Sequence, residues 1–128
     1  MRRYTVLILA LALCVACGQP ASMRQSQTVD GLTITLEHPR ELPINREQEM
    51  TITLMDASGK PVDGAIVALD LVMPAMPMGQ NKPLADPLGG GRYRVRAAYS
   101  MLGDWKTTVR ATINGKAYEA TFDQVVVE

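Results

Sequence analysis

The chain has 128 residues, and its 13 Lys and Arg residues balance 13 Asp and Glu residues, so the formal net charge at pH 7 is zero. This balance excludes a basic surface for nucleic acid, and we expect no nucleic-acid partner. The length suits one domain with its own hydrophobic core. Because Cys14 and Cys17 both lie near the N-terminus, a disulfide within the folded part is excluded as well.

The N-terminal segment predicts export. Two arginines precede an apolar run that is too short to span a bilayer, which is typical of a cleaved signal peptide. The run ends in a segment that resembles a lipoprotein box, with a small residue before Cys17, although Cys14 stands where an aliphatic residue is usual. We therefore expect a lipoprotein signal peptide at residues 1–16 and lipidation of Cys17. The alternative is a plain signal peptide and a soluble secreted protein.

Lipidation would make the protein periplasm-facing and membrane-anchored, in the outer membrane if the cell has one, since Gly18 rather than Asp follows the cysteine. Residues 17–28 are polar and lack periodicity, so they predict a flexible tether between lipid and domain. Residues 29–128 then form the folded domain.

Seven short runs in the domain have the composition or the alternation of β-strands. They cover residues 32–36, 50–54, 65–72, 84–88, 93–99, 105–113 and 116–124. The run at 65–72 is continuously apolar, which favours a central strand, whereas the prolines around 84–88 favour a short strand at a sheet edge.

One hairpin can be checked against the turn that joins its strands. Asn114-Gly115 is a preferred two-residue turn, and it places Ile113 opposite Lys116 and Trp105 opposite Gln124. This register puts the single Trp and the single Phe on one core face. The fold class predicted from these elements is all-β, a single immunoglobulin-like antiparallel β-sandwich of about seven strands.

Methionines supply the strongest functional signal. Met73, Met76 and Met78 occur in one proline-broken run after an apolar strand. A thioether is a soft, neutral ligand that suits Cu(I), and prolines stiffen a loop that could hold several thioethers together. The alternative is that these flexible side chains fill gaps at the end of the core.

Strand counting brings further candidates to the same end of the sandwich. The connections after the first, third and fifth predicted strands emerge at one pole, and they carry His38, the methionine run and Met101. The predicted metal site therefore consists of Met73, Met76, Met78, Met101 and His38. Its thioethers match Cu(I), while the imidazole also permits Cu(II). The alternatives are an exposed loop position for His38 before Pro39 and core packing of Met101 beside Trp105.

Four segments together resemble a known family. They are the stretch DASGKPVDGA at 56–65, the run MPAMPM at 73–78, Gly91-Arg92-Tyr93, and the Met-x-Gly-x-Trp signature at 101–105. Over residues of about 32–113 the chain resembles the YtkA-like domain, which is also related to FixH-type proteins. The resemblance implies a small exported β-sandwich, and some members resemble accessory proteins of copper handling and haem–copper oxidase assembly. FixH-type relatives usually keep a membrane helix, which cleavage before Cys17 would remove here.

We expect no enzyme. With one histidine and no cysteine in the mature domain, neither a Cys–His pair nor a zinc site of several N and S ligands can form. Two functions remain. The first is an exported lipoprotein that binds or delivers Cu(I) in the cell envelope, with the membrane and a copper-handling or respiratory envelope protein as partners. The second is a structural or interaction module that docks on an envelope or membrane partner through its Met-Pro loop.

Overall fold

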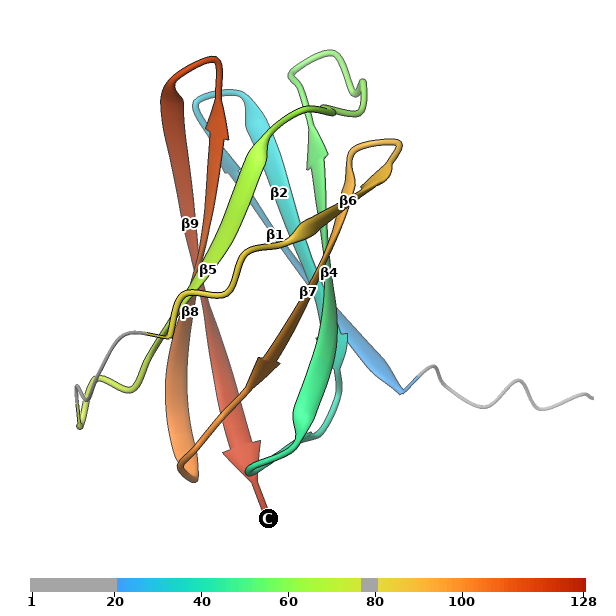
Figure 1. Ribbon diagram of the computed structural model, residues 1–128. Helices are drawn as coiled ribbons and strands as arrows, with labels where there is room; N and C mark the ends of the chain where they lie inside the picture. Colours follow the sequence, from blue (N-terminus) through green and yellow to red (C-terminus); the bar gives the residue numbers. More distant parts are fainter. Residues whose placement is uncertain (1–20, 77–80) are drawn as a thin grey trace, which may run out of the picture.

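The structure, a computed structural model, describes residues 21–76 and 81–128. These residues form nine strands in two packed sheets (Figure 1). The strands are β1 Ser22–Val29, β2 Leu32–Pro39, β3 Leu42–Pro43, β4 Glu47–Met55, β5 Ile66–Val72, β6 Asp86–Gly89, β7 Arg92–Ala98, β8 Gly103–Ile113 and β9 Lys116–Val127.

The order of the strands defines the fold class. One sheet has the order β1-β2-β4-β7-β6 and the other β3-β9-β8-β5. In a seven-stranded immunoglobulin-like sandwich, one sheet has the order A-B-E-D and the other G-F-C. Strands β2-β4-β7-β6 follow the first order and β9-β8-β5 follow the second. The predicted fold class is therefore confirmed. The seven predicted strands are these seven, and the structure adds β1 at a sheet edge and the short β3, which pairs in parallel with β9.

The core lies between the sheets and follows from the alternation of the strands. In β2, Leu32, Ile34 and Leu36 are buried, while the intervening threonines are half-buried on the outer face. The predicted hairpin register is confirmed, since Ile113 pairs with Lys116 and Trp105 with Gln124. An alternating pattern and a turn of fixed length were sufficient to set this register.

Strand β5 differs from its prediction. Its continuous apolar run favours a central strand, but β5 is the last strand of its sheet. Residues 81–85 compensate by running along its free edge, where the amides of Leu69 and Leu71 donate to the carbonyls of Pro83 and Asn81, both at 3.0 Å. The edge is covered, so β5 does not present a free row of backbone donors and acceptors along the described segment. Strand β6 lies at a sheet edge, as its proline predicts.

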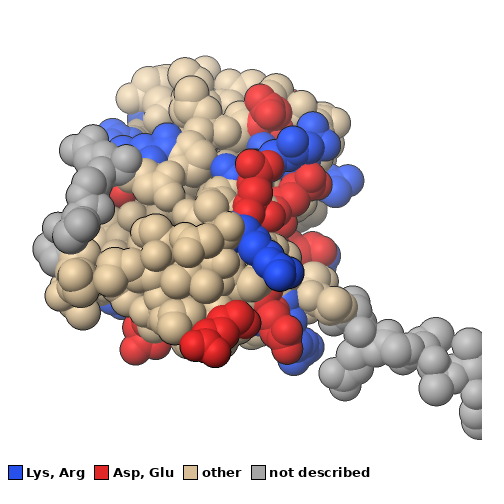
Figure 2. Space-filling view, turned by 60° about the horizontal axis from the view of Figure 1, so that its bottom comes forward, with Lys and Arg blue, Asp and Glu red and all other residues tan. Residues whose placement is uncertain are grey.

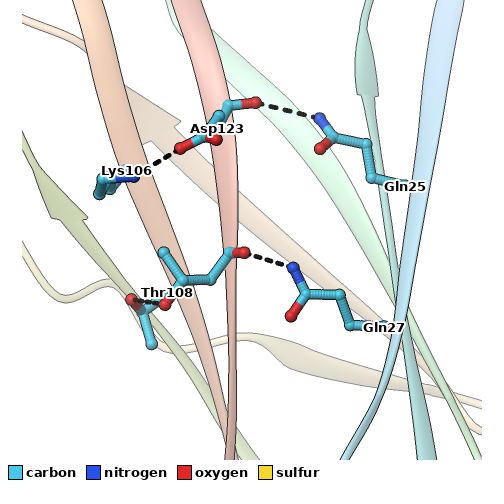
Figure 3. A network of polar contacts seen from close by, with 6 residues as sticks. Gln25, Gln27, Lys106, Thr108 and Asp123 are labelled. Carbon is cyan, nitrogen blue, oxygen red and sulfur yellow. Dashed lines mark hydrogen bonds and ion pairs between the residues drawn. The ribbon is translucent and has the colours of Figure 1, made fainter.

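Strand β1 corrects the predicted flexible tether at residues 17–28. Ser22–Val29 pair along their whole length with β2, and residues 17–20 lie outside the described part of the chain. Side-chain amides of Gln25 and Gln27 also reach across to β9, where they donate to the carbonyls of Asp123 and Thr121 (Figure 3). The inward face of β1 is thus held by polar contacts, so a search for apolar alternation misses it.

Candidate functional site

The two ends of the sandwich differ, and a groove opens at one of them. We call this the groove end; it is where β2, β5 and β7 finish and β8 begins, at the bottom of Figure 1. The groove has a volume of about 550 Å³ and mostly apolar walls. Its walls come from both sheets and include Met23, Gln25, His38, Pro74, Trp105 and Gln124. Figure 2, in which this end is turned forward, shows a broad uncharged area with charged side chains gathered mainly toward its right and lower margins.

His38 lies inside β2, with only 4% of its surface exposed, so the alternative of an exposed loop histidine is wrong. Its Nδ1 is 2.8 Å from the carbonyl oxygen of Pro39, and its Nε2 is 3.1 Å from the side-chain nitrogen of Gln25. A carbonyl oxygen only accepts, so Nδ1 carries the proton and donates it. Nε2 is then the unprotonated nitrogen, and it accepts from the Gln25 amide.

Met73 lies directly after β5 and contacts the start of β8. A Cβ at Gly103 would lie 3.1 Å from the methyl carbon of Met73, and Gly103 has φ of 115°. Both facts favour glycine, because the position is crowded and its φ is rarely adopted by other residues. Two residues later, the indole nitrogen of Trp105 donates to the carbonyl of Met101 at 2.9 Å. The methionine run and the Met-x-Gly-x-Trp signature are therefore in contact.

The predicted metal ligands lie at one end without surrounding one point. Met73 and Met101 are half-buried against the core, whereas 45% of Met76 is exposed at a turn in which its amide donates to the Met73 carbonyl at 3.1 Å. His38 instead faces the groove, to which Pro74 from the same run contributes. Met78 and the predicted lipidation site, Cys17, lie outside the described residues. Among the described residues, no group of three or more His, Cys, Asp and Glu side chains could hold a metal ion.

Sequence reasoning missed Met23. It is the register partner of His38 on the neighbouring strand, and both residues line the groove. The residues that share its face of β1 are Gln25, Gln27 and Val29, and only Val29 among these is apolar. The single sequence signal was this weak alternation, which becomes readable only once β1 is known to be a strand.

A buried polar cluster lies behind the groove. The side-chain oxygen of Gln124 accepts from the Tyr99 hydroxyl and, at 2.5 Å, from the Thr107 hydroxyl, while its nitrogen is 4.0 Å from the Met50 sulfur. Burial raises the pKa of the Tyr99 phenol above its ordinary value, although its hydrogen bonds with Thr107 and Gln124 act in the opposite direction. The cluster explains why Gln124 interrupts the apolar alternation of β9: all of its polar atoms have partners within the core.

These features define an immunoglobulin-like β-sandwich with a methionine-containing end. The YtkA-like family model matches residues 26–110, which is more than half of the chain. The chain therefore belongs to the YtkA-like family, and this membership suggests an envelope-associated domain.

Other comparisons add little. No curated protein matches the sequence. The chain is similar to the crystal structure of the Lin-41 filamin domain, with 14% identity, a TM-score of 0.48, and coverage of 78% of this chain and 89% of that one. Within the described residues, no helix has the length and apolar character needed to cross a membrane.

Proposed function

We propose that this protein is a non-enzymatic envelope lipoprotein that binds Cu(I) at the groove end and delivers it to a copper-handling or respiratory envelope protein. The observation that carries the proposal is that thioethers and the single imidazole lie at the same end of the sandwich. Met73 packs on Gly103, Met101 accepts from Trp105 through its carbonyl, and Pro74 continues from Met73 into the wall that His38 also lines. Neutral sulfur ligands in apolar surroundings favour Cu(I) over Zn²⁺ or Mg²⁺.

A binding measurement tests this function. The purified protein, kept under reducing conditions with a chelator that competes for Cu(I), should take up about one Cu(I) or its soft mimic Ag(I) and ignore Zn²⁺ and Mg²⁺. The double variant Met76→Leu with Met78→Leu should lose affinity sharply while its unfolding free energy changes by less than ~1.5 kcal/mol, since Leu and Met have similar volumes. Met55→Leu is the matched control, because Met55 lies at the opposite end of β4 from the groove.

The second candidate function is a docking module that uses the exposed Met76 as part of its contact surface. An exposed, flexible thioether side chain adapts to a protein partner as readily as to a soft metal. Absence of Cu(I) binding by the parent protein would favour the docking module, whereas unchanged binding by the double variant would place the Cu(I) ligands outside Met76 and Met78.

Anchoring by Cys17 is tested separately. Cys17→Ser should release the protein from membranes, because a lipid with two or more acyl chains supplies the stable attachment. Cys14→Ser is the control, since this residue is expected to be removed with the signal peptide. Equal recovery of both variants in the membrane fraction would contradict lipidation at Cys17.

A further inference from the structure

Met23 and His38 form a cross-strand pair at the mouth of the groove. They are register partners in the antiparallel ladder of β1 and β2. Side chains of directly opposed residues in such a ladder stand on the same face, with Cβ atoms about 4.5–5.5 Å apart. Both side chains line the groove, so a thioether and an imidazole from adjacent strands share one concave surface.

The hydrogen bonds of His38 match those of a metal-ligating histidine. Its Nδ1 donates to the Pro39 carbonyl at 2.8 Å, which fixes the tautomer and the orientation of the ring. Histidine ligands commonly donate their second nitrogen to a backbone carbonyl in this way, so that the other nitrogen presents its lone pair to the metal. In His38 that other nitrogen is Nε2, which faces the groove wall formed by Gln25.

The side-chain nitrogen of Gln25 contacts His38 Nε2 and a backbone carbonyl at the same time. Its side-chain nitrogen is 3.1 Å from His38 Nε2 and 3.2 Å from the carbonyl oxygen of Asp123 on β9. An amide nitrogen has two hydrogens, so it serves both acceptors at once. If an ion takes Nε2, Gln25 loses one partner and keeps the other, and the contact between β1 and β9 survives.

We propose that His38 Nε2 and Met23 Sδ are ligands for Cu(I) in the groove, and that Gln25 is a competing cover which must release Nε2 before the ion binds. The proposal rests on the proposed copper function, and it assigns a ligand pair outside the methionine run. A neutral imidazole and a thioether together form a donor set that accepts a soft monovalent cation. This donor set includes no carboxylate, whereas a site for a hard cation would use carboxylate oxygens.

Met23 has a close internal control in Met55. Their exposed fractions are 40% and 39%, and they lie at opposite ends of the same sheet, opposite His38 and Thr33 respectively. Met23→Leu should therefore lower Cu(I) affinity at least about tenfold, and Met55→Leu should leave it unchanged. The two variants should have the same midpoint of thermal unfolding, since each replaces a methionine by leucine at nearly the same exposure.

Gln25 has a control in Gln27. Both glutamines donate from β1 to a carbonyl of β9, but only Gln25 contacts the histidine. Gln25→Ala should raise Cu(I) affinity by on the order of fivefold, because the ion no longer competes with a neutral hydrogen bond. Gln27→Ala should not raise it. A purely structural role of Gln25 predicts lower or unchanged affinity instead.

The decisive readout is ¹⁵N NMR of the imidazole in the intact protein, which is unambiguous because His38 is the only histidine. Without metal, Nδ1 should be protonated and Nε2 should not. Adding Cu(I), or Ag(I) as a probe that air does not oxidise, should shift the Nε2 resonance and leave Nδ1 protonated. Cu(I) binding with an unshifted Nε2 would overturn the ligand pair while the copper function stands. Absence of any Cu(I) binding would overturn both.

Discussion

The two ends of this sandwich are closed in different ways. At the end opposite the groove, which we call the turn end, the loop between β4 and β5 is held by short polar contacts. Asp56 Oδ1 accepts from the amides of Ser58 and Lys60 at 2.9 and 3.0 Å, and Asp63 Oδ1 accepts from the Gly91 amide at 2.8 Å. A hollow at this end has a volume of about 200 Å³, compared with about 550 Å³ for the groove.

The groove end is instead closed by side chains that can move. Half-buried methionines pack on Gly103 and the core margin, and the Gln25 amide is shared between two acceptors. Hydrogen bonds from backbone amides to a carboxylate resist rearrangement of a loop, whereas thioethers and a shared amide allow rearrangement without loss of the fold. Stability is therefore concentrated at the turn end and in the core, and adaptability at the groove end.

Trp105→Ala should have the largest effect of the predicted substitutions. Trp105 is buried, packs edge-on against Tyr99 with ring centroids 5.2 Å apart, and separates the groove from the core. Removing it leaves a large cavity, so the unfolding free energy should fall by roughly 3–5 kcal/mol. Chemical denaturation measures this change. A loss below ~1 kcal/mol would mean that Trp105 belongs to the groove surface rather than to the core.

Gly91→Ala tests the rigidity of the turn end. A Cβ at this position would lie 2.6 Å from the Leu54 carbonyl oxygen and 2.8 Å from Pro61, and φ is 73°. Since backbone atoms cannot move aside easily, we expect a loss of about 2–3 kcal/mol. Gly64→Ala is the matched control, with φ of 77° and nothing within 4 Å of the added atom. Its loss should be about 1 kcal/mol, and equal losses would show that the close approach at Gly91 relaxes freely.

Tyr99→Phe probes the polar cluster behind the groove. The phenol donates to Gln124 and lies 3.2 Å from the Thr107 hydroxyl, so its removal should cost about 1–2 kcal/mol at neutral pH. Thermal or chemical unfolding at neutral pH, with the parent protein as reference, measures this loss.

The same substitution should change the alkaline part of the stability profile. Burial raises the pKa of Tyr99 above 10.0 in the folded protein. In the unfolded chain the phenol therefore ionises at a lower pH than in the folded protein. The stabilising contribution is complete below pH 10.0 and is lost as the pH rises through the folded-state pKa. Tyr99→Phe should therefore flatten the decline of stability at high pH. A decline of equal slope in the variant would assign the alkaline transition to other groups.

The smallest effect is expected at the rim of the groove. Lys106 and Asp123 form an ion pair at 2.8 Å between exposed side chains, which are 54% and 82% accessible. Pairs of this kind contribute little because water and salt screen them, so Lys106→Gln should change stability by less than ~1 kcal/mol. A larger loss that persists at high salt would show that the rim belongs to the rigid part of the molecule.

The sequence predicted those parts of the fold in which local pattern and burial agree. The hairpin around Asn114 is correct to the residue, because the turn fixes the register and the alternation fixes the face. Strand β1 was missed because its inward residues include Gln25 and Gln27, whose partners are carbonyls nearly a hundred positions away in the chain. Such partners are defined only by the tertiary structure.

The candidate site shows the same division. The predicted order of the strands placed His38, Met73 and Met101 at one end of the sandwich, and in the structure they lie at that end. It could not foresee that β2 continues through Pro39, so that His38 is a buried strand residue with both ring nitrogens engaged. It also could not find Met23, because a methionine in a polar segment acquires meaning only from its partner on the neighbouring strand.

The position of Trp105 gives the protein an internal optical probe. As the single tryptophan, it is the source of all indole emission, and it borders the groove on one side and Tyr99 on the other. Light absorbed by Tyr99 can pass to the indole over this short separation, and the emission wavelength then depends on how much water the groove admits. Entry of an ion, a peptide or a lipid tail would each alter the spectrum without any attached label, so the intact protein signals the occupancy of its own groove.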